Sequence, residues 1–256
     1  MGGRMSTTAL ADAKLFDKLE RDQFDSDGLN RGLAGRFSVV AAVLRAPGAF
    51  VRDLKGEKNL WRYASSLVLT TFLFSAAYGA ILGMFQPGLQ TLFAAAKLPI
   101  VVLGTALLCT PTFYVFNGIL GSKFTFRQTL AAVLFLSTSV ALVLVAFAPI
   151  TWFFTVSTSG AGFLTALHLS VFLISAIYGV HSLNTARKYL GYIDETHTPI
   201  NGAFLFLWFV IVLFVALQMA YYLRPFIEPT TDLKFFLGQR GLFLDAFSTP
   251  GAPYGR

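Results

Sequence analysis

The chain has 256 residues, of which 55% are hydrophobic and only 13% are charged, and its formal net charge is +7. Soluble domains carry about a quarter charged residues, so this composition excludes an ordinary soluble protein and predicts a membrane protein. The net charge does not indicate a nucleic acid partner, because the basic residues flank apolar runs, where headgroups and topology explain them. With one cysteine, Cys109, there is no internal disulfide.

Residues 1–36 are predicted to form a polar cytoplasmic tail. Acidic residues stand where the apolar stretch of a signal peptide would lie, so we expect no such peptide. Leu15 and Leu19 fall near helical spacing within residues 6–24, which predicts a short amphipathic helix. A solvated tail and a helix that docks on a partner are both compatible with this pattern.

Residues 37–58 are apolar at first but too short to cross a bilayer before Pro47 and Gly48 interrupt them. We predict an interfacial helix along the cytoplasmic leaflet, with its apolar side in the acyl boundary. Phe37 and Arg45 are its predicted contacts with the membrane surface or a partner.

Residues 59–223 contain five long runs that hold no Asp, Glu, Lys or Arg, and each exceeds the roughly 20 residues that cross a hydrocarbon core. The predicted fold is all-α: a polytopic membrane protein with a five-helix transmembrane bundle and flanking interfacial amphipathic helices. The predicted spans are 63–85, 98–120, 130–155, 161–183 and 202–223.

Basic residues divide unequally between the two faces that five spans define. Fifteen of the 20 Lys and Arg fall on the face of the N-terminus, and five, including Lys97, fall on the other. Because Lys and Arg favour the cytoplasmic side, we predict a cytoplasmic N-terminus and a C-terminus on the outer side, periplasmic or luminal.

The first span carries a stripe of small residues that consists of Gly79 and Gly83, in a GxxxG spacing, with Ala76 and Ala80 beside them. Small residues let a neighbouring helix approach closely, which is how helices associate without a hydrophobic driving force in lipid. Packing within the chain is the favoured use, and contact between two copies is the alternative.

Polar residues within the later spans are the candidate lining of a cavity. We expect a short surface helix over 86–97 and then a second span kinked at Pro111, with neighbouring hydroxyl groups satisfying the freed carbonyl. His168 is expected to hydrogen-bond between helices. A packed kink and a polar notch are both open readings; the notch would comprise Cys109, Thr110, Pro111, Asn117, His168 and Gln218.

Residues 224–256 follow the last span and are too hydrophobic to be free in water. We expect this tail on the outer leaflet or against a partner, with contacts through Phe235, Phe236, Phe243 and Phe247.

Catalytic chemistry has few candidate groups in this sequence. The spans hold no acidic residue, and HExxH, CxxC, Walker and GxSxG motifs are missing from the whole sequence. We therefore expect no enzyme activity, no catalytic or metal-binding residues and no cofactor.

Residues 115–129, VFNGILGSKFTFRQT, resemble a pattern of Yip-domain membrane proteins. The matching positions are the turn Gly121-Ser122-Lys123 and the segment Phe126-Arg127-Gln128-Thr129 that opens the third span. The resemblance implies five spans and a cytoplasmic N-terminus over 37–223, in a member of the bacterial type. Eukaryotic members act in vesicle trafficking and bind Rab-type GTPases, whereas the hydrophobic tail of this chain departs from the family.

Two functions fit these features. The favoured one is a non-enzymatic integral membrane subunit or scaffold that binds partner proteins or organises the bilayer. The alternative is a channel, permease or lipid-handling transporter with a polar lining from the second to fifth spans. Expected partners are the lipid bilayer and other membrane proteins, in a hetero-complex or a homo-oligomer.

Overall fold

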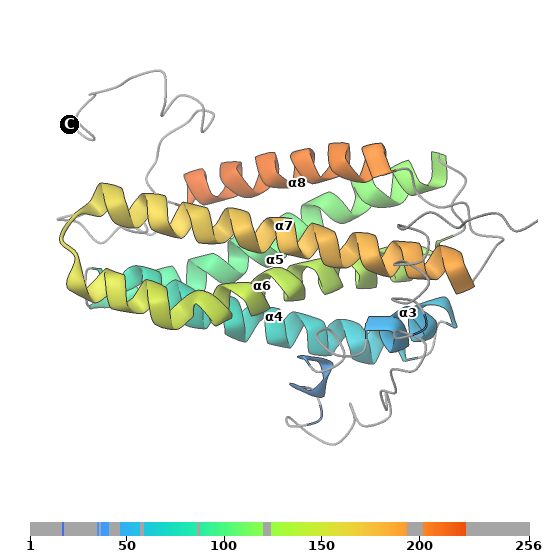
Figure 1. Ribbon diagram of the computed structural model, residues 1–256, viewed down its shortest axis with the longest axis horizontal. Coiled ribbons are helices and arrows are strands. Elements are labelled where there is room, and N and C mark those ends of the chain that lie inside the picture. Colours follow the sequence, from blue (N-terminus) through green and yellow to red (C-terminus); the bar gives the residue numbers. More distant parts are fainter. Residues whose placement is uncertain are drawn as a thin grey trace, which may run out of the picture.

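The structure is a computed structural model that describes residues 17, 35, 37–40, 47–56, 59–85, 88–119, 124–193 and 202–223. Within these ranges the chain is all-helical, as predicted. Five long helices run side by side, and the short helix α3 (Pro47–Lys55) lies across one end of them (Figure 1). We call this end of the bundle the α3 end and the other the far end.

The long helices are α4 (Leu60–Gly83), α5 (Leu89–Ile119), α6 (Phe126–Ser157), α7 (Ala161–Ile193) and α8 (Gly202–Tyr222). All five are long and apolar enough to cross a membrane, which confirms the five predicted spans. Thr158, Ser159 and Gly160 alone join α6 to α7, so these two helices are antiparallel neighbours, as the short turn predicts.

Helix α5 differs from the prediction at its start. A separate surface helix over 86–97 is wrong, because Leu89–Ile119 is one continuous helix that contains both Pro99 and Pro111. The first turns of α5 pack closely on α4. This packing explains why the helix continues past residue 97, where a boundary was predicted. Lys97, assigned from the sequence to the far-face loop, therefore lies inside α5 and is fully buried.

The small-residue stripe of α4 forms the contact with α5. A Cβ atom at Gly79 would lie 2.5 Å from the carbonyl oxygen of Ala94, and one at Gly83 would lie 2.7 Å from the Cα of Thr91. Both glycines are buried, whereas Ala76 and Ala80 are half-buried. The stripe thus brings two helices of the same chain together, as favoured from the sequence, and backbone rather than side chain limits their separation.

Hydroxyl groups bridge α4 and α6 in the middle of the bundle. The hydroxyls of Thr71 and Thr138 lie 2.9 Å apart, and Thr138 also lies within hydrogen-bonding distance of the carbonyls of Leu67 and Leu134. Thr71 and Thr138 are fully buried. Without water, such groups must find partners within the protein, so the seam holds the helices in one register.

Helix α8 lies at the edge of the bundle and packs mainly on α5 (Figure 1). Its side chains are mostly half-buried, with Leu205 and Trp208 fully buried. The rings of Trp208 and Phe113 of α5 lie 4.3 Å apart between centroids. This aromatic contact anchors the start of α8, and the half-buried Val212 and Val215 continue its packing against the same core.

Replacing Gly79 with Ala is expected to destabilise the bundle by about 1–3 kcal/mol, because the added methyl group meets the backbone of α5. Thermal unfolding of the detergent-solubilised protein measures the effect. Gly118→Ala is the matched control, since it lies in α5 with open space around its Cα. Equal unfolding temperatures for the two variants would contradict the close packing.

Candidate functional site

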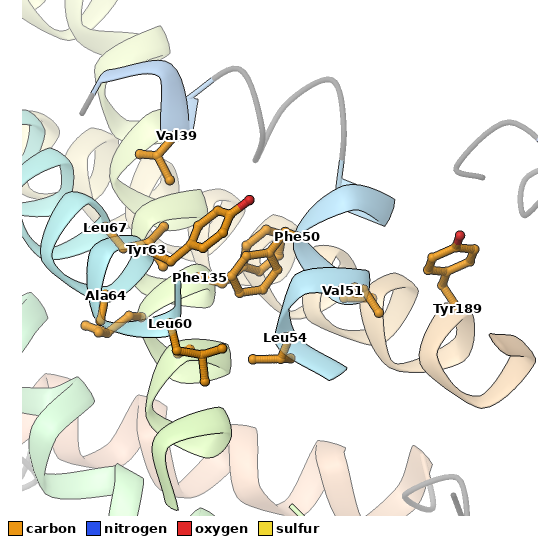
Figure 2. Close-up of a cluster of buried hydrophobic side chains, with 13 residues drawn as sticks. Val39, Phe50, Val51, Leu54, Leu60, Tyr63, Ala64, Leu67, Phe135 and Tyr189 are labelled. Carbon is orange, nitrogen blue, oxygen red and sulfur yellow. The ribbon is translucent and has the colours of Figure 1, made fainter. Parts of the chain in front are cut away.

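Helix α3 is bound to the bundle through an aromatic side chain at its centre. Phe50 stacks on Phe135 of α6 with ring centroids 4.7 Å apart, and it meets the ring of Tyr63 of α4 edge-on at 5.4 Å. Val51 and Leu54 are buried beside it, as Figure 2 shows. The short helix thus completes the hydrophobic core at this end of the bundle.

Two polar contacts fix the orientation of α3. The hydroxyl of Tyr63 donates a hydrogen bond to Asp53 Oδ2 over 2.8 Å. At the next residue, Gln128 Nε2 of α6 donates to the carbonyl oxygen of Leu54 over 3.0 Å. The last carbonyls of a helix have no partner within it, so Gln128 satisfies one of these groups in α3.

Gln128 also fixes the start of α6. Its Oε1 accepts a hydrogen bond from the backbone N–H of Thr125 over 2.8 Å, and the Thr125 hydroxyl accepts one from the backbone N–H of Gln128. This pair forms a capping box. One buried amide side chain therefore ends α3 and begins α6 at the same point. Sequence reasoning missed this role, although the spacing Thr-x-x-Gln before an apolar run is a known signal for it.

The apolar side of α3 lies elsewhere than the sequence indicated. Phe50, Val51 and Leu54 pack on protein, not in the acyl boundary, because the ends of α4, α6 and α7 present a matching apolar surface. Phe37 is half-buried, and its ring stacks on Phe74 of α4 with centroids 6.5 Å apart. The other predicted contact residues fall outside the described residues: Leu15, Leu19, Arg45, Phe235, Phe236, Phe243 and Phe247.

A second polar cluster surrounds His168 in the half of the bundle near the far end. His168 is buried; its Nδ1 lies 2.9 Å from the Tyr78 hydroxyl of α4, and its Nε2 lies 3.3 Å from the Thr155 hydroxyl of α6. The single hydroxyl proton of Thr155 is donated to the carbonyl of Thr151. Nε2 must then be the donor to Thr155, which leaves Nδ1 to accept from Tyr78. A neutral His168 thus joins α4, α6 and α7, in the interhelical role expected from the sequence.

The six residues of the predicted notch do not come together. Cys109, Thr110 and Asn117 are buried on α5, whereas Pro111 is exposed. The Thr110 hydroxyl donates to the carbonyl of Ala106, so it does not satisfy the Leu107 carbonyl that Pro111 frees.

The remaining notch residues lie at different depths. Asn117 is near the α3 end of α5, His168 is roughly 30 Å away by helical rise, and Gln218 is half-buried near the far end of α8.

Comparison with known families matches residues 41–193 to the Yip1 domain. The chain belongs to the Yip1 family. No curated protein and no solved structure matches it. The match includes α3 and the four helices α4–α7 and ends before α8, which is narrower than the range 37–223 expected from the sequence. Its assignment to the bacterial type stays a prediction.

Membership in the Yip1 family and five apolar helices make the chain an integral, multi-pass membrane protein. The segment that carries the resemblance includes Gln128, so part of the pattern has a structural explanation: it docks α3 while starting α6. Both elements joined by this contact lie within the family match.

Gln128→Glu separates the two roles of this side chain. A Glu still accepts from the Thr125 N–H, but its carboxylate cannot donate to Leu54 and repels the carbonyl instead. We expect the free energy of opening α3 to fall by about 1–3 kcal/mol, while α6 remains intact. Amide hydrogen exchange over 47–56 and over 126–135 tests the two parts. Unchanged exchange in α3 would show that Gln128 does not hold it.

Replacing both Tyr78 with Phe and His168 with Leu tests the far cluster through a double-mutant cycle. Hydrogen bonds between membrane helices contribute roughly 0.6–2 kcal/mol, so we expect a coupling energy in that range. Thermal unfolding in detergent measures it. Ser170→Ala is the control, because Ser170 is exposed on α7 and its hydroxyl bonds within the same helix. Additive effects of the two changes would contradict the assigned contact.

Proposed function

We propose that this Yip1-family protein is a non-enzymatic membrane scaffold that presents the α3 end of its bundle to partner proteins. The observation that carries the proposal is the docking of α3. Phe50, Tyr63 and Gln128 hold this nine-residue helix in one orientation, and its apolar side packs against the bundle. Its polar side is therefore a rigid surface outside the row of spans.

The polar groups of the spans support a scaffold over a transporter. Thr71 and Thr138 bond to each other, and His168 is held on both ring nitrogens. These groups connect helices in pairs and threes and do not form a continuous lining. A channel or permease would need polar groups that face a common path, and the predicted notch residues lie at different depths of the bundle.

Native mass measurement after gentle detergent extraction tests the proposed function. We expect other membrane proteins to co-purify with the wild-type chain, and we expect Gln128→Glu to weaken their retention because α3 is released. Ser170→Ala should retain them. A lone monomer that conducts ions or solutes in liposomes, with conduction lost in Asn117→Ala, would establish the transporter alternative instead.

The proposed orientation places the α3 end in the cytoplasm, as the distribution of Lys and Arg predicts. Cysteine labelling in intact cells tests it, in a Cys109→Ser background. A Cys at exposed Ser159, in the turn between α6 and α7, should react with an impermeant reagent from outside. A Cys at exposed Lys55 in α3 should react only after permeabilisation. The opposite pattern would reverse the assigned orientation.

A further inference from the structure

An apolar cavity of about 40 Å³ lies beneath α3. Phe50, Val51 and Leu54 form its side toward α3, and the other helices that line it are α5, α6, α7 and α8. A site for one water needs about 10–15 Å³ and several polar partners. This cavity is larger than that, and its lining side chains are all apolar, so its chemistry suits a hydrocarbon group better than water.

Three basic residues lie at the α3 end of the bundle, in the last turn of α3, the first turn of α6 and the last turns of α7. Lys55 follows the lining residue Leu54, Arg127 lies three residues beyond Phe124, and Lys188 lies two residues beyond Ala186. All three basic side chains are exposed. The single acid of α3, Asp53, accepts the Tyr63 hydroxyl. Basic residues at the end of the bundle that holds an apolar cavity are complementary to an amphipathic anion.

An unpaired amide lies near the same cavity. Asn117 of α5 is 1% exposed, and neither Nδ2 nor Oδ1 has a hydrogen-bond partner among the described residues. It is one helical turn from Phe113, which lines the cavity. The indole N–H of Trp208, whose ring contacts Phe113, also has no hydrogen-bond partner among the described residues. A buried amide without a partner is costly, and a ligand carbonyl would satisfy it.

We propose that the α3 end binds one anionic phospholipid from the surrounding bilayer. Lys55 and Arg127 bind its phosphate, Asn117 Nδ2 donates to an ester carbonyl, and the methylene groups next to that carbonyl enter the apolar cavity. This site goes beyond the proposed scaffold function and is independent of it, because it needs no protein partner.

Native mass spectrometry of the purified full-length chain tests the charged part of the site. Titration with phosphatidylglycerol and with phosphatidylcholine of the same acyl chains should give one bound phosphatidylglycerol at least tenfold tighter. The double variant Lys55→Glu, Arg127→Glu should abolish that preference. Arg62→Glu is the matched control, since Arg62 is exposed on α4, which does not line the cavity. Equal affinity for the two lipids would overturn the proposal.

Filling the cavity tests the acyl part. Ala132→Leu places a larger side chain in the lining and should lower phosphatidylglycerol affinity at least fivefold, whereas Ala146→Leu on the exposed side of α6 should not. Asn117→Leu provides a second variant, because removing an unpaired buried amide should preserve or raise the unfolding temperature while weakening lipid binding. Unchanged affinity in both variants would overturn the site. Glycerol phosphate, which lacks chains, should bind at least a hundredfold more weakly.

Discussion

Hydrogen bonding without water governs this structure. Within the hydrocarbon region every polar group must find its partner inside the protein, since each unsatisfied one costs several kcal/mol. At three places the bundle meets this constraint by joining helices to one another through side chains. Thr71 meets Thr138, and His168 is held between Tyr78 and Thr155. At the α3 end, Gln128 bonds to backbone groups of two separate helices.

These contacts stabilise different parts of the molecule in a common way. In lipid, apolar side chains have similar energies against a neighbouring helix and against lipid tails. Apolar packing alone therefore does not fix the rotation of a helix in the bundle. The hydroxyl seam, the histidine and the close glycine contact each permit one register. Together they give the four helices α4–α7 a defined arrangement, and they place the ends of α4, α6 and α7 where α3 can pack against them.

The number of spans could be predicted from the sequence, because uncharged apolar runs of that length are typical of membrane-spanning helices. It also indicated the glycine stripe and the bridging role of His168, since small residues and a lone buried imidazole are each restricted in what they can do. It failed at α5, where the buried Lys97 and Pro99 resemble a loop boundary in composition but lie within a continuous helix.

The docked helix was beyond the reach of sequence patterns for a physical reason. An amphipathic segment of this length has the same periodicity whether its apolar side meets lipid or protein. Only the positions of Phe135, Ala186 and Tyr189, far along the chain, decide the matter, and those depend on how the spans assemble. The prediction of a notch was wrong for the same reason. Asn117 and His168 are both polar, but they lie at different depths in the bundle.

The docking of α3 has a consequence for the order of biogenesis. The residues that hold it, Gln128, Phe135 and Tyr189, are all synthesised after it and lie on helices that must first enter the membrane. During translation α3 therefore emerges with its apolar side uncovered and must wait until α7 has been made. Its docking completes assembly of the α4–α7 core, so a ribosome-bound chain stalled before α7 would still present this surface to chaperones or to the membrane.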